Sequence, residues 1–149
     1  PEGRGDISKI KFKNKYIFLI DESYNSNPLS LESAIKNFDL INVKSSKKHL
    51  VMGDMLELGK HTKKLHIQIS KVINLSSIGS VSVFGKAAQE TYKKIKNEKR
   101  GIILRKTSKI FDLIVNNLNN NDYLMIKGSN STGLNKFVKI LKRKKLNVI

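Results

Sequence analysis

Hydrophobic residues recur along the chain in two alternating patterns. Short apolar segments bounded by polar turns predict strands at residues 7–12, 16–20, 49–52, 80–84, 102–104 and 123–126. Apolar residues at helical spacing follow most of them, in the sets Leu31-Ala34-Ile35-Phe38, Leu65-Ile69-Val72-Ile73, Ala88-Tyr92-Ile95, Ile110-Phe111-Ile114-Val115-Leu118 and Leu134-Phe137-Val138-Leu141. This alternation predicts an α/β fold with a mainly parallel sheet.

The first two strands differ from the rest because only Lys13-Asn14-Lys15 separates them. So short a connection predicts an antiparallel hairpin. We therefore predict a Rossmann-like three-layer sandwich of about six strands, mostly parallel, with one antiparallel N-terminal strand and helices on both faces. Asn27 before Pro28 is the preferred order of helix cap and first helical residue, so we expect Asn27 to cap a helix.

Three polar loops follow strands of this sheet, at residues 21–28, 53–59 and 127–133. Right-handed crossovers bring the carboxyl ends of parallel strands to one edge, which is where ligands bind in open α/β sheets. We expect the three loops, together called the rim, to lie side by side. Alternation along the first of the three strands points one of Asp21 and Glu22 into the rim and the other away.

Composition narrows the classes of protein. The chain has 149 residues, enough for a single domain with a real core, and no apolar run reaches the roughly 18 residues of a membrane span. Without cysteine it has neither disulfides nor thiolate metal sites, and residues 1–4 do not resemble a signal peptide. These features favour a cytoplasmic protein with no membrane insertion.

The net charge of +17 invites a nucleic-acid interpretation. However, lysine occurs 25 times and arginine only four times, alongside abundant Asn and Ile, which is typical of a coding bias spread over the surface. Solvated helix ends explain the two basic clusters, at residues 93–100 and 142–145, better than a nucleic-acid face does. We expect no nucleic-acid partner.

Other familiar sites are missing. The chain has neither the G-x-x-x-x-G-K-[ST] phosphate loop nor the G-x-G-x-x-G fingerprint. Its three histidines, His49, His61 and His66, lack metal-site spacing, and we expect them at surface or boundary positions. We predict no metal site.

Three motifs, in this order, resemble the C-terminal domain of the Mur ligases. Gly3-Arg4-Gly5-Asp6 looks like the family's Gly-Arg segment, and residues 21–28, read D-E-S-Y-N-S-N-P, are close to its D-[DE]-[AS]-Y-N-A-N-P. Residues 53–59 match its G-D-M-L-E-L-G without a change, and Lys127-Gly128-Ser129 fits its K-G-S. The resemblance covers nearly the whole chain, and within the family it is strongest to the member that uses D-alanyl-D-alanine.

The resemblance implies an ATP-dependent amide ligase of peptidoglycan synthesis, which joins D-alanyl-D-alanine to UDP-MurNAc-tripeptide through an acyl phosphate. Enzymes of the family have three domains, with the phosphate loop and catalytic lysine on the central one. Residues 1–149 then form one C-terminal domain, with residues 1–6 ending an interdomain linker. We expect the chain to work as a monomer with its N-terminal and central domains, to be inactive alone, and to leave Mg²⁺ mainly to the central domain.

The resemblance also implies site residues. Arg4 would stabilise charge on the transferred phosphate. The nucleotide would contact Asp21, Glu22, Tyr24 and Asn25, with Glu22 in the place of the family's best-kept acid. The dipeptide would contact Asp54, Met55, Glu57, Leu58, Lys127, Ser129 and Asn130, with Asp54 or Glu57 facing its ammonium; the family commonly has Arg where Asn130 stands. A tight loop in which the leucines only pack is the alternative for residues 53–59.

Three alternatives remain open on the sequence. One is a sibling Mur or folylpolyglutamate-type ligase with another amino substrate, which G-D-M-L-E-L-G disfavours. A basic, non-catalytic α/β module that binds nucleic acid is the second. The third is a stand-alone nucleotide-binding domain.

Overall fold

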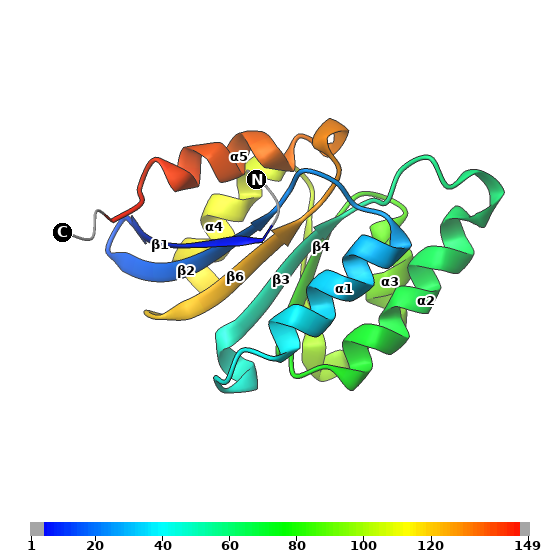
Figure 1. The fold of residues 1–149 in the computed structure, drawn as a ribbon, viewed down its shortest axis with the longest axis horizontal. Helices are drawn as coiled ribbons and strands as arrows, with labels where there is room; N and C mark the ends of the chain where they lie inside the picture. Colours follow the sequence, from blue (N-terminus) through cyan, green and yellow to red (C-terminus); the bar gives the residue numbers. More distant parts are fainter. Residues whose placement is uncertain (1–4, 147–149) are drawn as a thin grey trace.

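The computed structural model describes residues 5–146, which form a six-stranded sheet with helices on both faces (Figure 1). The strand order is β1-β2-β6-β3-β4-β5. The strands are β1 (Asp6–Phe12), β2 (Lys15–Glu22), β3 (Lys48–Gly53), β4 (Ser80–Phe84), β5 (Arg100–Leu104) and β6 (Asp122–Lys127). The longer helices are α1 (Pro28–Asp39), α2 (Thr62–Leu75), α3 (Ala88–Lys94), α4 (Ile110–Asn117) and α5 (Leu134–Lys142).

The pairing of the strands confirms the predicted fold class. β1 and β2 are antiparallel, whereas β2–β6, β6–β3, β3–β4 and β4–β5 are all parallel. The hairpin turns where the sequence predicts it, with Lys13 in the left-handed region at φ 54°. A Rossmann-like sheet with one antiparallel strand at its N-terminal edge is therefore present.

Two separate hydrophobic clusters hold the layers together. On one face α1, α2 and α3 pack against residues such as Ile20, Leu50 and Met52, and on the other α4 and α5 pack against residues such as Leu19 and Val51 (Figure 1). Adjacent strand residues thus point to opposite clusters, as the period of two requires. Because both faces of the central strands are covered, β3 is buried along its whole length.

Helix α1 begins as predicted. The Asn27 side chain accepts a hydrogen bond from the Ser30 backbone N–H at 2.9 Å, and the Ser30 hydroxyl accepts one from the Asn27 N–H at 3.0 Å. This reciprocal arrangement satisfies two backbone donors that would otherwise be unpaired. It fixes where the loop of residues 21–28 ends.

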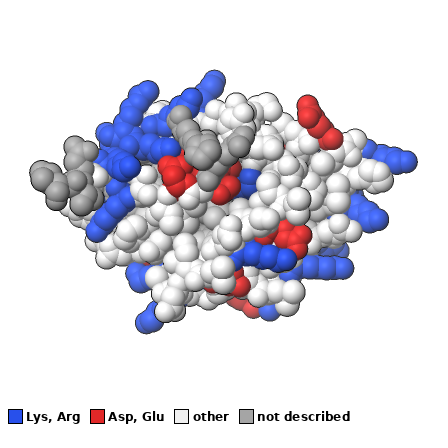
Figure 2. Space-filling model, viewed as in Figure 1, with Lys and Arg blue, Asp and Glu red and all other residues white. Residues whose placement is uncertain are grey.

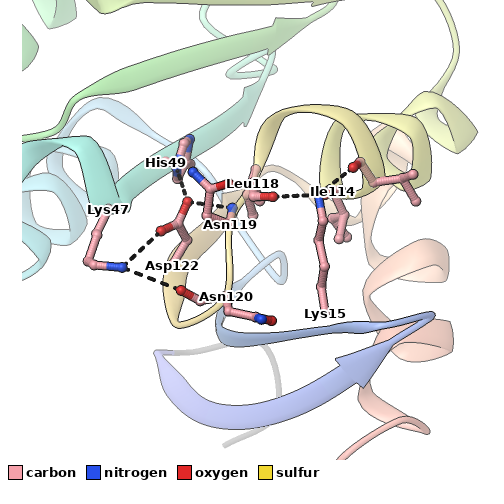
Figure 3. A network of polar contacts seen from close by, with 9 residues as sticks. Lys15, Lys47, His49, Ile114, Leu118, Asn119, Asn120 and Asp122 are labelled. Atoms are coloured by element: carbon pink, nitrogen blue, oxygen red, sulfur yellow. Dashed lines mark hydrogen bonds and ion pairs between the residues drawn. The ribbon is translucent and has the colours of Figure 1, made fainter.

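The expectation of surface or boundary histidines is wrong for His49 and His66, which are both buried. The Nε2 atom of His49 lies 2.8 Å from Oδ2 of the buried Asp122 at the amino end of the sheet, and the Asn119 N–H donates to the same oxygen (Figure 3). Lys47 lies 3.5 Å from the other carboxylate oxygen. Burial of these polar groups is possible because each finds a partner, which the local sequence pattern does not reveal.

Lysine side chains also take structural positions in the fold. In Figure 3 the Lys15 ammonium reaches carbonyl oxygens at the end of α4, including those of Ile114 and Leu118. Lys48 is only 1% exposed, and its Nζ donates to the Asp39 carbonyl at 3.0 Å and the Ser77 hydroxyl at 2.7 Å. Within residues 5–146, no helix has the length and apolar character needed to cross a membrane.

Candidate functional site

The three loops of the rim lie side by side at the carboxyl edge of the sheet. Glu22 of β2 and Met52 of β3 are both in register with Lys127 of β6, so the strands that lead into the three loops are direct neighbours. The expected juxtaposition of residues 21–28, 53–59 and 127–133 is therefore confirmed.

The two acids at the end of β2 face different surroundings. Asp21 is 3% exposed, and its Oδ1 accepts hydrogen bonds from the backbone and hydroxyl of Ser23. Its Oδ2 lies 3.2 Å from Nζ of Lys142 on α5, which also lies 3.0 Å from Asp6. Burial opposes the charge on Lys142, but the bonds to both carboxylates outweigh it and raise the pKa of Lys142. Through Lys142, the Asp21 side chain thus helps to hold α5 against the sheet.

Of these two acids, Glu22 is the one not engaged by α5. Its side chain is half-buried, and Oε2 lies 3.9 Å from the ammonium of Lys127. Burial raises the pKa of Glu22, Lys127 opposes the rise, and the neighbouring Asp21 and Asp6 add to it. Burial lowers the pKa of Lys127, against the influence of Glu22. Burial therefore disfavours the charged form of both side chains, and the attraction between the two opposite charges partly offsets this penalty.

The main chain ahead of β1 comes up against Glu22. Gly5 has φ +91°, and its N–H donates to the Asp21 carbonyl at 2.6 Å. A Cβ atom at Gly5 would lie 2.6 Å from Oε1 of Glu22, so only glycine allows this approach. The neighbouring Arg4, the predicted phosphate contact, lies outside the described residues.

The other nucleotide-side candidates lie on the outer part of the same loop. Tyr24 is 49% exposed and Asn25 is also exposed, so both present side chains at the surface. The Asn25 side chain accepts a hydrogen bond from the Ser26 N–H at 2.8 Å, while its backbone carbonyl accepts one from the Lys127 ammonium. Lys127 therefore faces the loop of residues 21–28.

Residues 53–59 divide between packing and exposure. Met55 is 1% exposed in the core and Leu58 packs against the same cluster, whereas Glu57 is exposed with φ 62°. Asp54 directs Oδ1 to the Ala88 N–H at 2.7 Å, near the start of α3. The loop is thus partly the tight, packed turn of the structural alternative, with Asp54 still at the rim.

A pocket of about 200 Å³ opens between these loops. Its walls are residues of the loops after β3, β4 and β6, namely Asp54, Leu56, Phe84, Gly85, Ser131 and Thr132. Gly85 has φ +114°, and a Cβ there would lie 2.3 Å from Oδ1 of Asp54. The pocket therefore has a carboxylate beside a backbone wall at one side and hydroxyl groups at another.

The loop of residues 127–133 is held by its own hydrogen bonds. The Thr132 hydroxyl donates to the Ser129 carbonyl at 2.7 Å, and Gly133 turns into α5 at φ +83°. Ser129 is buried, and the exposed Asn130 accepts a hydrogen bond from Asn135 at 2.5 Å. Ser129 and Asn130, both predicted to contact the amino substrate, therefore lie in the same loop as the pocket residues Ser131 and Thr132 but do not line the pocket.

A family model described as "Mur ligase, glutamate ligase domain" matches residues 8–130. The chain belongs to this Mur ligase family. UDP-N-acetylmuramoyl-tripeptide–D-alanyl-D-alanine ligases resemble it: that of Buchnera aphidicola from Acyrthosiphon pisum is 33% identical over 123 residues, and that of Bacillus subtilis 29% over 127. Each alignment covers 83% of this chain but only 26% and 27% of the respective relatives, so the chain spans about a quarter of their length.

Solved structures support the Mur ligase fold. The MurF ligase from Thermotoga maritima in complex with ADP matches 97% of this chain and 31% of its own, with a TM-score of 0.75 and 22% identity. A domain from a putative UDP-N-acetylmuramate:L-alanyl-γ-D-glutamyl-meso-diaminopimelate ligase of Haemophilus ducreyi matches 91% of this chain and 97% of its own, with a TM-score of 0.57 and 12% identity. These likenesses establish the fold.

Sequence reasoning missed several residues of this Mur ligase domain. Phe84 and Gly85 line the pocket although neither lies in a loop that the sequence singles out, and Ser131 and Thr132 line it from the predicted loop of residues 127–133 without being predicted individually. His66 is also part of the site's support: its Nε2 accepts a hydrogen bond from the Met55 N–H at 2.9 Å, and its Nδ1 lies 2.7 Å from the Thr62 carbonyl. The buried ring thus fixes the loop of residues 53–59 to α2.

Side chains that could ligate a metal ion do not gather into a cluster in the part of this Mur ligase domain that the structure describes. Residues 5–146 hold no group of three or more His, Asp or Glu side chains arranged to bind an ion. The carboxylates of Asp21 and Asp54 are already engaged by hydrogen bonds within the chain.

Proposed function

We propose that the chain is the C-terminal domain of an ATP-dependent ligase that joins D-alanyl-D-alanine to UDP-MurNAc-tripeptide in peptidoglycan synthesis. The observation that carries this proposal is the unchanged G-D-M-L-E-L-G sequence at residues 53–59, beside the loop of residues 21–28 at one rim. The likeness to curated ligases of that name supports the choice of amino substrate.

In the proposed reaction, the tripeptide carboxylate attacks the γ-phosphate of ATP, giving an acyl phosphate and ADP. The dipeptide amine then attacks the acyl carbon, phosphate leaves, and an amide bond forms. This domain contributes mainly by position, since holding two substrates in attack geometry removes entropy from the barrier. Arg4 is proposed to stabilise the transferring phosphate. Mg²⁺ is assigned no step on this chain.

The geometry supports a division of roles at the rim. Glu22, Tyr24 and Asn25 are proposed for the nucleotide side, because Asp21 is engaged with Ser23 and Lys142. For the amino substrate, Oδ2 of Asp54 is proposed to pair with the dipeptide ammonium, since Oδ1 already accepts from Ala88.

Apolar walls for the two methyl groups of the dipeptide are proposed at Leu56 and Phe84. Both line the pocket beside Asp54, whereas Met55 and Leu58 pack into the core. Within the motif, Asp54 and Leu56 therefore line the pocket while Met55 and Leu58 pack into the core, because adjacent loop residues point in opposite directions.

A dedicated nucleic-acid face has less support. Lysine and arginine side chains gather at both ends of the face seen in Figure 2, where Figure 1 shows α5 and α2. The rings of Phe18 and Tyr123 stack on each other at 4.6 Å, and the Lys9 ammonium lies 5.5 Å from the Phe18 ring centre. Because the ring faces are already occupied, they offer no ready platform for stacked bases.

The experiment that tests the proposal uses the full-length product of the gene that encodes this chain. It is mixed with ATP, UDP-MurNAc-tripeptide and D-alanyl-D-alanine, and phosphate release and product mass are followed. We expect phosphate release that depends on the dipeptide, and the mass of the pentapeptide product. Activity with a single amino acid instead would identify a sibling ligase, and no activity from the folded protein would reject the ligase assignment.

Two matched variants test the amino-substrate role. Asp54→Asn should raise the KM for the dipeptide about tenfold, because an ion pair to the ammonium is lost. Glu57→Gln should leave that KM nearly unchanged, since Glu57 is exposed and does not line the pocket. The opposite ranking would move the ammonium contact to Glu57.

A further inference from the structure

Lys127 occupies an unusual place for a lysine. It is the last residue of β6, directly between Glu22 of β2 and Met52 of β3 in the register of the sheet. Lys127 is only 2% exposed, so its ammonium has almost no contact with water. A lysine buried to this extent at the functional edge of a sheet requires partners.

Both partners of the ammonium belong to the loop of residues 21–28. The Nζ atom donates to the backbone carbonyl of Asn25 and lies 3.9 Å from Oε2 of Glu22. The main chain of Lys127 meanwhile opens the loop of residues 127–133, and the Gly128 N–H donates to the Glu22 carbonyl at 3.4 Å. One residue therefore connects two loops of the rim.

The position is electrostatically costly. Helix α1 begins at Pro28, close behind Asn25, and the amino end of a helix disfavours a cation. Loss of water adds to this cost, which the charge of Glu22 opposes, and the Asn25 carbonyl accepts a hydrogen bond from the ammonium. Because the ammonium is enclosed by that loop, it is not directed at the pocket, which Lys127 does not line.

We propose that Lys127 is a positioning residue for the loop of residues 21–28, the proposed nucleotide side of the rim, and not a ligand of the amino substrate. By fixing the Asn25 carbonyl and the Glu22 carboxylate to the end of β6, it sets where the exposed side chains of Tyr24 and Asn25 stand. This inference rests on the proposed ligase function, in which that loop meets ATP.

The test compares two buried lysines in the full-length enzyme. Lys127→Met removes the ammonium at the rim, and Lys48→Met removes an equally buried one that bonds Asp39 and Ser77 instead. We expect Lys127→Met to raise the KM for ATP about tenfold and to leave the KM for the dipeptide within about twofold. Lys48→Met should change neither KM.

Amide hydrogen exchange on the 149-residue chain gives a second, activity-independent readout. We expect the amides of residues 23–27 to exchange at least about tenfold faster in Lys127→Met than in Lys48→Met, because only the first change releases that loop. Equal exchange in the two variants would overturn the positioning role, whatever the chain catalyses.

The kinetic outcomes separate the two proposals. A wild-type enzyme that does not join the dipeptide would reject the ligase function, while the exchange experiment would still decide whether Lys127 holds the loop. An active wild type whose Lys127→Met variant shows a raised KM for the dipeptide alone would make Lys127 a substrate ligand. No change in either KM would also overturn the inference.

Discussion

A single buried hydroxyl group should lower the stability of this domain. Ser26 is 3% exposed, and its Oγ has no hydrogen-bond partner among the described residues. The backbone N–H of Ser26 is satisfied separately by the Asn25 side chain at 2.8 Å, so the hydroxyl makes no contribution to that bond. Ser26→Ala should therefore stabilise the fold, and the family pattern given above has alanine at this place.

The magnitude follows from the cost of desolvating one hydroxyl. A buried polar group without a partner costs about 1–3 kcal/mol, and removing it returns that cost less a small term for the vacated volume. We expect the free energy of unfolding to rise by about 1–2 kcal/mol, which corresponds to about 2–6 °C in Tm for a chain of this size.

Ser23 supplies the matched control. It has the same 3% exposure in the same loop, but its hydroxyl and backbone N–H both bond Asp21. Ser23→Ala removes a hydrogen bond to a carboxylate and should lower the free energy of unfolding by about 1.5–3 kcal/mol. Urea denaturation of the 149-residue chain, followed by far-UV circular dichroism, measures both changes. If Ser26→Ala destabilised the chain, the claim that its hydroxyl is unpaired would be refuted.

Backbone strain and charge give the remaining predictions. Gly85→Ala should lower the free energy of unfolding by about 3 kcal/mol, because the new Cβ atom would meet Asp54. Gly59→Ala should lower it by only about 1 kcal/mol, because the Cβ atom there meets nothing within 4 Å and the cost comes from the positive φ alone. Equal urea midpoints for the two variants would contradict this. Burial raises the pKa of Glu22 above 4.5, so the folded state binds more protons and stability falls as pH rises above 4.5. Hydrogen bonding lowers the pKa of Asp39 below 3.8, so its contribution is lost as pH falls through that range. In urea titrations across pH, Glu22→Gln should remove the fall in stability at higher pH, and Asp39→Asn should remove the loss of stability at low pH. Parallel pH profiles for the wild type and the variants would argue against both pKa shifts.

The fold was predictable because its signals are local or topological. The short connection after Phe12, which is Lys13-Asn14 in the structure, requires a hairpin, and the alternation of strands and helices leaves few arrangements for the other strands. The order Asn27-Pro28 predicts the start of α1 for the same local reason. Contacts between residues far apart were not predictable in this way. His49 and Asp122 are 73 residues apart, and neither is apolar, so no periodic pattern indicates their burial.

The candidate site could be predicted as a set of neighbouring loops, but not side chain by side chain. The family motifs identify residues 21–28 and 53–59, and the sheet brings these loops together. Whether a given side chain points into the core or the pocket depends on the conformation of an irregular loop, which alternation does not describe. Met55 and Leu56 are neighbours in one motif, yet the first packs in the core and the second lines the pocket.

Charge at the rim runs against the composition of the whole chain. The chain has only 12 acidic residues among 149, against 29 lysines and arginines. Five of these acids nevertheless lie in the first three family motifs: Asp6, Asp21, Glu22, Asp54 and Glu57. Lys127 and Lys142 pair with three of them, so acids are concentrated at the carboxyl edge of the sheet and are partly balanced there by two lysines. A general lysine bias would not place acids there, so the net charge of +17 describes the solvated surface, and the chemistry of the rim follows from its own few carboxylates.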